Sequence, residues 1–119
     1  MLTLYGYFSP PTRAVKMLLD ILQIDYNYQF LHIMKGEHKT HELLNKNPQR
    51  SLPFIEDGSF TMNESGPILI YLMEKYAGKE HNYLFPSDDV IVRAKIQQRI
   101  GFASTALHKS FREAYVSLC

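Results

Sequence analysis

SLPFIEDGSFTMNESGPILIYLMEKY, residues 51–76, is the stretch that decides the fold of this chain. It contains two short strand patterns joined at Asp57-Gly58, the commonest two-residue hairpin signal, followed at once by a helical pattern. Glu64 and Ser65 fall where the helix begins, and Pro67 suits its first turn because the missing N–H has no partner there. The segment therefore predicts two antiparallel strands leading directly into a helix.

The start of this helix has two interpretations. Its unpaired backbone N–H groups, its partial positive charge and the Ser65 hydroxyl suit a small carboxylate, and Glu64 beside them suits an ammonium group. An amino-acid head group carries both charges. In the simpler interpretation, Ser65 only caps the helix and Glu64 only complements its dipole. The local pattern leaves both interpretations open.

The composition is that of an ordinary globular chain. Of its 119 residues 45% are hydrophobic, and it has no uninterrupted apolar run long enough to span a membrane. The 13 basic and 12 acidic residues nearly cancel and are interspersed, which argues against nucleic acid as a partner. Met1 is followed at once by a strand pattern rather than a secretory signal, and Cys119 is the only cysteine. We therefore expect a cytoplasmic protein with no internal disulfide.

The first part of the chain predicts a strand–helix–strand unit. Strand patterns at Leu2–Tyr5 and Ile24–Phe30 flank a helical pattern at Pro11–Leu22, which implies parallel strands joined by a right-handed crossover. Ser9 precedes the two prolines that open this helix. It is placed either to cap the helix or to offer its hydroxyl to an anion at the positive helix end.

Three histidines follow the second strand pattern. His32, His38 and His41 lie in a polar loop that leads into a short helix ended by Pro48. A zinc site needs three or four converging ligands, and no fourth group is apparent here. We predict solvated histidines and no metal site.

The last third of the sequence predicts a linker and one long helix. Residues 77–86 mix Gly, Asn and Pro with charged residues, as linkers do. Ser87 is then expected to cap a helix from about Asp88 to Leu118. Its apolar residues recur every three or four positions: Ile96, Ile100, Ala103, Leu107, Phe111, Ala114 and Leu118.

Three motifs together resemble the glutathione S-transferases. They are Ser9-Pro10-Pro11-Thr12-Arg13-Ala14-Val15, Asn47-Pro48-Gln49-Arg50 followed by Leu52-Pro53, and the helix start at Glu64-Ser65. The resemblance is to the serine-type enzymes, and most closely to the insect delta and epsilon classes. It implies a thioredoxin-like α/β domain with a mixed four-stranded sheet over residues 1–80. Residues 81–119 would then be the linker and the first helix of an all-helical second domain.

The resemblance also implies a role for individual residues. Ser9 would be the catalytic residue that activates glutathione. The glutathione-binding residues would be His38, Arg50, Leu52, Pro53, Glu64 and Ser65. Leu52 would act through its backbone, and Pro53 through a cis peptide bond. Arg50 departs from the family pattern, which has histidine there, and its longer guanidinium can shift how glutathione sits.

The function implied is conjugation of the glutathione thiolate to electrophilic hydrophobic small molecules, a detoxification reaction. Glutathione would be a co-substrate, with no metal or other cofactor, and the expected assembly is a homodimer without nucleic acid or membrane partners. The turn Ser9–Thr12 lacks cysteine, so thiol–disulfide exchange by this turn is excluded. Tyr5 and Tyr7 are the competing hydroxyls, because other classes of the family use a tyrosine near the first strand.

Two further expectations concern the protein as a whole. The alternative function is a non-catalytic binding or dimerisation module of the same fold, against which the intact Ser9, Glu64 and Ser65 argue. In addition, the apolar stripe of the last helix runs almost to residue 119, whereas later helices cover it in the resembled family. We therefore expect a truncated transferase that is oligomeric or aggregation-prone and conjugates poorly.

Overall fold

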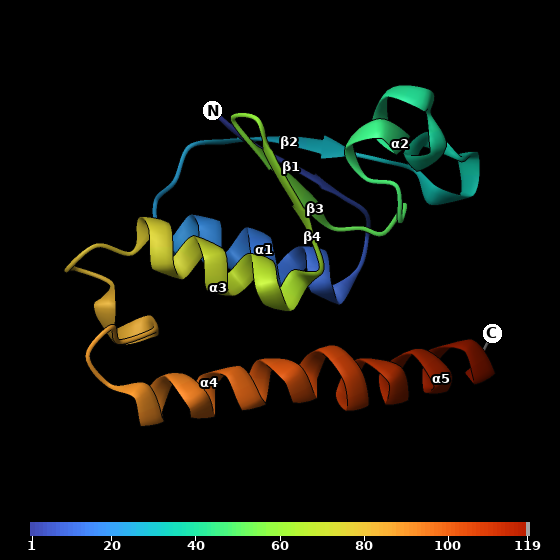
Figure 1. The fold of residues 1–119 in the computed structure, drawn as a ribbon. Helices are drawn as coiled ribbons and strands as arrows, with labels where there is room; N and C mark the ends of the chain where they lie inside the picture. Colours follow the sequence, from blue (N-terminus) through green and yellow to red (C-terminus); the bar gives the residue numbers. More distant parts are fainter. Residues whose placement is uncertain (119) are drawn as a thin grey trace.

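The computed structural model describes residues 1–118, with side chains for residues 1–114. Figure 1 shows three layers, namely a β-sheet, a pair of helices beneath it, and a long helical rod beneath the pair. The strands are β1 (Leu2–Gly6), β2 (Tyr26–Phe30), β3 (Phe54–Asp57) and β4 (Phe60–Asn63). The α-helices are α1 (Pro10–Ile21), α2 (His41–Lys46), α3 (Ser65–Tyr76), α4 (Val90–Phe102) and α5 (His108–Leu118). The 3-10 turns are η1 (Ile33–Lys35), η2 (Glu37–Lys39) and η3 (Asn82–Leu84).

The sheet is mixed, and its strand order is β2-β1-β3-β4. β1 pairs in parallel with β2 and antiparallel with β3, and β4 completes the hairpin with β3. The crossover between the parallel strands is α1, as the sequence predicts. The predicted thioredoxin-like α/β architecture followed by a long helix is confirmed.

Several predicted boundaries differ by one or two residues: β1 extends to Gly6, and α1 spans Pro10–Ile21 instead of Pro11–Leu22. β2 begins at Tyr26, because the N–H of Ile24 donates to the carbonyl of Leu19 and closes the end of α1 instead. The hairpin loop is Gly58-Ser59, because Asp57 is still paired with Phe60. Gly58 has φ +64°, the conformation that favours glycine at the first position of a two-residue hairpin loop.

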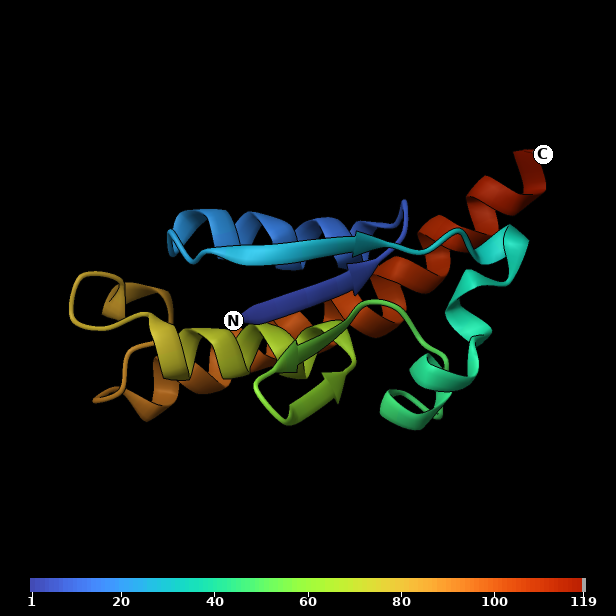
Figure 2. The ribbon, with the colours of Figure 1, turned by 90° about the horizontal axis from the view of Figure 1, so that it is seen from above.

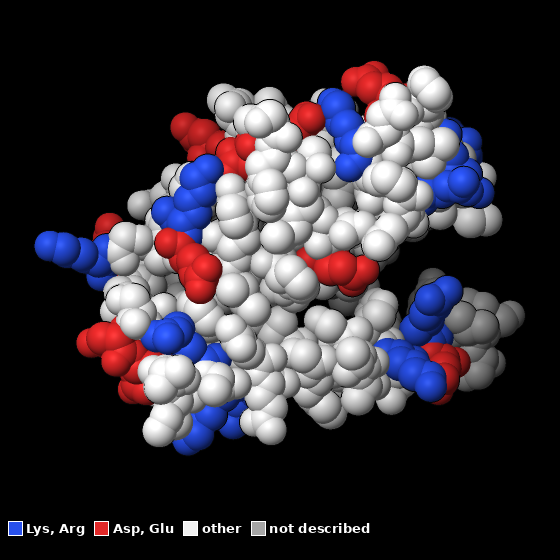
Figure 3. Space-filling view, viewed as in Figure 1, with Lys and Arg blue, Asp and Glu red and all other residues white. Residues whose placement is uncertain are grey.

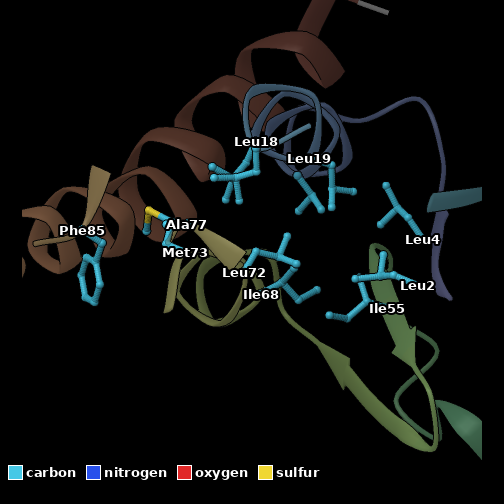
Figure 4. Close-up of a cluster of buried hydrophobic side chains, with 12 residues drawn as sticks. Leu2, Leu4, Leu18, Leu19, Ile55, Ile68, Leu72, Met73, Ala77 and Phe85 are labelled. Atoms are coloured by element: carbon cyan, nitrogen blue, oxygen red, sulfur yellow. The ribbon is translucent and has the colours of Figure 1, made fainter. Parts of the chain in front are cut away.

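One hydrophobic core lies between the sheet and the helix pair. Figure 4 shows Leu2, Leu4 and Ile55 from the strands facing Leu19 of α1 and Ile68 of α3. Leu4, Leu19, Ile55 and Ile68 are fully buried. The apolar faces of α1, α3 and β1 therefore pack together in one layer. This packing positions the starts of the two helices relative to the sheet.

The predicted linker is packed against this core. Ala77 and Phe85 are 8% and 6% exposed and belong to the same hydrophobic cluster, at the end where Met73 lies (Figure 4). Residues 77–86 are thus a docked segment, with η3 inside it, rather than a solvated tether.

The long helix begins later than predicted and is not uniform. Asp89 caps α4, since its Oδ1 accepts the N–H of Val92 at 3.0 Å, so the expectation that Ser87 is the cap is wrong. Ser87 instead belongs to the preceding turn, where its carbonyl accepts the Arg93 guanidinium at 2.7 Å. A π-helical turn, Ala103–Leu107, joins α4 to α5 and was not predicted.

The apolar stripe of the rod is partly buried along α4 and open to solvent beyond it. Ile96 and Ile100 pack against the core, whereas Leu107 and Phe111 are 54% and 55% exposed. The side chain of Leu118, like Cys119, lies outside what the structure describes. Among the described residues, none of the helices combines the length and apolar character that crossing a bilayer requires.

Candidate functional site

The hydroxyl of Ser9 stands at the start of α1. Ser9 is the N-cap, with extended backbone angles (φ −148°, ψ 149°), and its Oγ accepts the N–H of Thr12 at 3.4 Å. The prediction that it caps α1 is confirmed. Its side chain remains partly exposed and lines a hollow beside the rod, so the cap does not exclude contact with a ligand.

Thr12 holds this hydroxyl in place, and the sequence analysis missed it. Thr12 is 1% exposed, its Oγ1 lies 2.9 Å from the Oγ of Ser9, and it also accepts the N–H of Tyr7 at 3.4 Å. A Cβ on Gly6 would lie only 2.3 Å from Thr12 Cγ2, so only glycine fits there. The signal for Thr12 was its place in the four-residue turn that begins at Ser9.

The two competing tyrosines have different surroundings. The Tyr5 hydroxyl donates to Glu56 at 3.3 Å, its ring stacks on Phe54 with centroids 4.3 Å apart, and burial together with Glu56 raises the pKa of its hydroxyl. Tyr5 therefore stays protonated at neutral pH and is engaged in packing, as predicted. Tyr7 instead lines the same hollow as Ser9.

Glu64 has the most unusual backbone in the candidate site. It precedes α3 with φ 74° and ψ 113°, its side chain is exposed, and it makes no capping hydrogen bond. Ser65 is the first residue of α3, so the simpler interpretation in which Ser65 is the cap is wrong. A non-glycine residue in such a conformation costs on the order of 1–3 kcal/mol and tends to occur at functional sites.

The loop before β3 is held against the start of α3 by amide side chains. Asn63 Nδ2 donates to Gln49 Oε1 at 2.8 Å and to Asn47 Oδ1 at 3.1 Å. Asn47 is 5% exposed and donates in turn to the carbonyl of Ser51 at 2.7 Å. Because Asn63 is the residue before Glu64, this network couples the loop to the helix start.

The predicted cis peptide bond between Leu52 and Pro53 is present. The strand register pairs Phe54 with Asn63. The residues just outside that pair, Pro53 and Glu64, are therefore neighbours at the mouth of the β3–β4 hairpin. Sequence reasoning assigned Leu52, Pro53 and Glu64 to one site, and the register brings them to one place.

The other end of the hairpin is tied to α3 by a buried carboxylate. Asp57 Oδ2 accepts the hydroxyls of Tyr71 and Tyr76, each at 2.7 Å, and Lys75 Nζ at 2.8 Å. Burial alone would raise the pKa of Asp57, but these three donors outweigh burial and lower it to about 2. Asp57 thus fixes the hairpin on the helix that Glu64 and Ser65 begin.

The N-terminal ends of α1 and α3 lie at the same end of the molecule. The two helices run side by side beneath the sheet in both views (Figures 1 and 2). Pro10, Pro11 and Ser65 together line a hollow of about 270 Å³ that the rod closes from the other side. Ser9 lines the adjoining hollow, which shares Pro10 and His108 with this one, so two positive helix ends and two hydroxyls lie at the same end of the fold, which favours an anionic ligand there.

His38 and Arg50 lie away from this meeting point. Neither residue lines the hollow of Ser9 or that of Ser65. Arg50 is exposed with φ 60°, and His38 lies in η2. The expectation that the histidines are solvated is wrong for His32 and His38, because their Nδ1 atoms are buried without a hydrogen-bond partner among the described residues.

No three His, Cys, Asp or Glu side chains of the described part of the chain converge as metal ligands would. A further hollow, of about 580 Å³, borders Glu64 on its other side and runs over β4, where Phe60 and Met62 line it. It does not include Ser9 or Ser65.

Residues 4–80 match the family model described as "Glutathione S-transferase, N-terminal domain". The chain belongs to the glutathione S-transferase family. It is 37% identical over 107 residues to glutathione S-transferase 2 of the mosquito Anopheles gambiae, an alignment that covers 90% of this chain and 50% of the mosquito protein. The resemblance to the family that the sequence analysis described is thereby confirmed.

Two solved structures support the insect epsilon and delta type. An epsilon-class glutathione S-transferase from the housefly Musca domestica superposes with a TM-score of 0.85 at 34% identity, covering 92% of this chain and 49% of the other. A delta-class glutathione transferase from Nilaparvata lugens gives 0.86 at 33% identity, covering 98% and 54%. The chain spans about half the length of the curated relatives it matches.

Proposed function

We propose that this protein is a glutathione transferase that conjugates the glutathione thiolate to electrophilic, largely apolar small molecules. The observation that carries the proposal is the meeting of the α1 and α3 starts at one end of the fold, with Ser9 on one and Glu64-Ser65 on the other. Another solved relative, a glutathione transferase homolog from Drosophila mojavensis, holds bound glutathione and is 37% identical to this chain.

The γ-glutamyl end of glutathione has the charges that the α3 start complements. We assign its ammonium group to the exposed carboxylate of Glu64, and its carboxylate to the Ser65 hydroxyl and the first N–H groups of α3. The strained φ of Glu64 supports this assignment, since it has no capping role that would explain it. Each of these charge-assisted contacts contributes about 1.5–3 kcal/mol.

The rest of the tripeptide follows from the family roles. We propose that the backbone of Leu52, beside the cis Pro53, pairs with the cysteinyl residue. His38 and Arg50 would then hold the glycine carboxylate, as histidine residues do at these positions in the resembled classes. The Nδ1 atom of His38 is buried and has no hydrogen-bond partner among the described residues, so the imidazole has hydrogen-bonding capacity that the chain itself does not use.

The chemistry is stabilisation of a thiolate. The thiol proton of glutathione passes to solvent, the sulfur attacks the electrophilic carbon, and the leaving group departs with its bonding electrons. A thiol pKa lowered by about two units from about 8.5 corresponds to roughly 2.7 kcal/mol, which we assign to Ser9 and the α1 dipole. Ser9 has one hydrogen to donate, and in the structure it donates that hydrogen to Thr12 Oγ1 at 2.9 Å; for the hydrogen to reach the sulfur, this contact must reverse so that Thr12 donates to Ser9.

We further propose that residues 1–80 bind glutathione, that residues 81–119 supply part of the electrophile side, and that the protein acts in the cytoplasm as a homodimer. β4 is an edge strand of the sheet, and the apolar side chain of Phe60 on it is 42% exposed at the rim of a hollow, which supports association through this face. Light scattering tests the dimer: a stable monomer at micromolar concentration contradicts it.

The rival function is a non-catalytic module of the same fold. The deciding experiment is a spectroscopic titration of the glutathione thiolate in wild type and in Ser9→Ala, with Tyr7→Phe as the control. We expect Ser9→Ala to raise the apparent pKa of bound glutathione while its affinity changes only a few-fold. A shift in Tyr7→Phe alone would reassign the hydroxyl, and failure of the wild-type protein to bind immobilised glutathione would favour the non-catalytic module.

A further inference from the structure

The hollow that contains Ser9 has an unusual lining. It encloses about 560 Å³ between the start of α1 and the last helix, α5. Its walls are Tyr7, Phe8, Ser9, Pro10, Arg13, His108, Phe111 and Arg112. Three of these residues are aromatic and two are guanidinium cations, and none is acidic. The lining of the hollow therefore combines apolar surface with two positive charges.

The aromatic surface is exposed. Phe8 is 73% exposed, although its ring lies 5.4 Å from that of Tyr7 and 4.7 Å from that of Phe30. Phe111, on the facing wall, is 55% exposed. Clustered aromatic side chains open to solvent beside a hydroxyl favour a flat apolar ligand over bulk water.

The two arginines come from opposite walls. Arg13 belongs to α1 and Arg112 to α5, so the fold and not a local sequence cluster brings them to one hollow. The ion pairs among the described residues use Lys46 and Lys75, and neither Arg13 nor Arg112 takes part in one. Figure 3 shows the surface hollowed between the α/β body and the C-terminal half of the rod, with Lys or Arg side chains (blue) on its lower wall.

We propose that the preferred electrophile of this site is an aromatic compound carrying an anionic group, such as a carboxylate. The inference rests on the proposed transferase function and specifies its second substrate. The ring lies against Phe8 and Phe111, the anion meets Arg112 and Arg13, and the reacting carbon faces the sulfur held at Ser9. For a chloro-dinitroarene, the new bond is C–S, the broken bond is C–Cl, and chloride leaves with the electron pair.

The test compares two electrophiles of nearly equal shape. They are 4-chloro-3,5-dinitrobenzoate, which is anionic, and 4-chloro-3,5-dinitrobenzamide, which is neutral, each at saturating glutathione and each divided by its own uncatalysed rate. A carboxylate about 6 Å from one guanidinium in a partly exposed site gains a preference of roughly tenfold in kcat/KM. That preference is expected to shrink several-fold in 1 M salt, because exposed charges are screened.

The variant and its control lie on one helix. Arg112→Met keeps the apolar stem and removes one of the two charges, and it should lower the ratio of the two kcat/KM values several-fold toward one, with Arg13 retaining the remainder, while sparing the amide. Lys109→Met makes the same change in net charge at a residue that does not line the hollow, and it should leave the ratio as in wild type. An equal loss of the ratio in both variants would mean that overall charge, not this hollow, selects the substrate.

A binding measurement separates this inference from the proposed function. Calorimetry with the unreactive 3,5-dinitrobenzoate and 3,5-dinitrobenzamide should show tighter binding of the anion in wild type and a several-fold smaller preference for the anion in Arg112→Met. Such a result supports the inference even if neither electrophile is turned over. The absence of turnover would refute only the transferase function. Equal affinity for the two compounds in the wild-type protein overturns the inference, whether or not conjugation occurs.

Discussion

Replacing Asp57 by asparagine should destabilise the protein without touching the proposed glutathione contacts. Asp57 ends β3 and accepts three hydrogen bonds from α3, from Tyr71, Lys75 and Tyr76. An asparagine side chain at this position would keep the shape but lose the negative charge that these donors surround. The hairpin would then be held to α3 mainly by the strand pairing and the apolar core.

The size of the expected loss in stability follows from the change in the pKa of Asp57 on folding. Its pKa falls from 3.8 to about 2 on folding, and each unit is worth about 1.4 kcal/mol, so ionised Asp57 stabilises the fold by about 2 kcal/mol. Because the folded pKa is the lower one, this contribution is complete above about pH 5. It is lost as the pH falls through about 4 to 2, and close to half of it is gone by about pH 3.

Urea denaturation at several pH values checks both parts of this prediction. Asp57→Asn should lower the free energy of unfolding by about 2 kcal/mol at pH 7, and the gap to wild type should close between about pH 5 and pH 2. Asp25→Asn, an exposed carboxylate in the loop before β2, should change stability by less than about 0.5 kcal/mol. A gap that stays constant down to pH 2 would refute the reasoning, since the Asp57 charge would then not be its source.

Three other predictions test the construction of the site, the last with a matched control. Thr12→Val should raise the apparent pKa of bound glutathione and lower kcat/KM roughly three- to tenfold by leaving Ser9 without its hydroxyl partner; an unchanged thiolate titration would contradict this role. Glu64→Gly should raise the unfolding free energy by about 1 kcal/mol by relieving its positive φ, yet weaken glutathione binding at least tenfold in calorimetry; a less stable variant would argue against stored strain. Gly6→Ala should cost about 1–3 kcal/mol by overpacking against Thr12, whereas Gly101→Ala, in open space within α4, should stabilise by about 0.5–1 kcal/mol; equal effects of the two in urea unfolding would contradict the packing argument.

Short-range patterns carried most of the correct predictions. The helix after Ser9, the hairpin and the helix that begins at Ser65 each follow from capping residues, Gly or Pro signals and periodicity within a dozen positions. The same local signals misplaced the hairpin loop by one residue and the α4 cap by two. Asp57-Gly58 and Gly58-Ser59 are both suitable two-residue loops, and Ser87 and Asp89 are both suitable N-cap residues, so the local sequence does not choose between them.

The periodicity of apolar residues did not predict the π-helical turn at Ala103–Leu107. The spacing of apolar residues along the rod fits a uniform α-helix, and Gly101, two residues before the turn, does not by itself predict an extra residue in the helix. The rod packs on α3 where Gly66 allows a close approach: a Cβ there would lie 3.1 Å from Ile100 and 3.4 Å from Ser104. That packing involves residues almost forty positions apart, which no local pattern reports.

The sequence by itself determined the family, the layered α/β architecture and the residues that begin α1 and α3, because these depend on motifs and on periods that the backbone imposes locally. Only the tertiary structure decided which side chains share a hollow. Asp57 beneath three donors of α3, and Arg13 facing the same hollow as Arg112, are juxtapositions made by the strand register and the packing of helices. Such contacts depend on distances in space between residues far apart in the chain, and single-sequence patterns contain no measure of those distances.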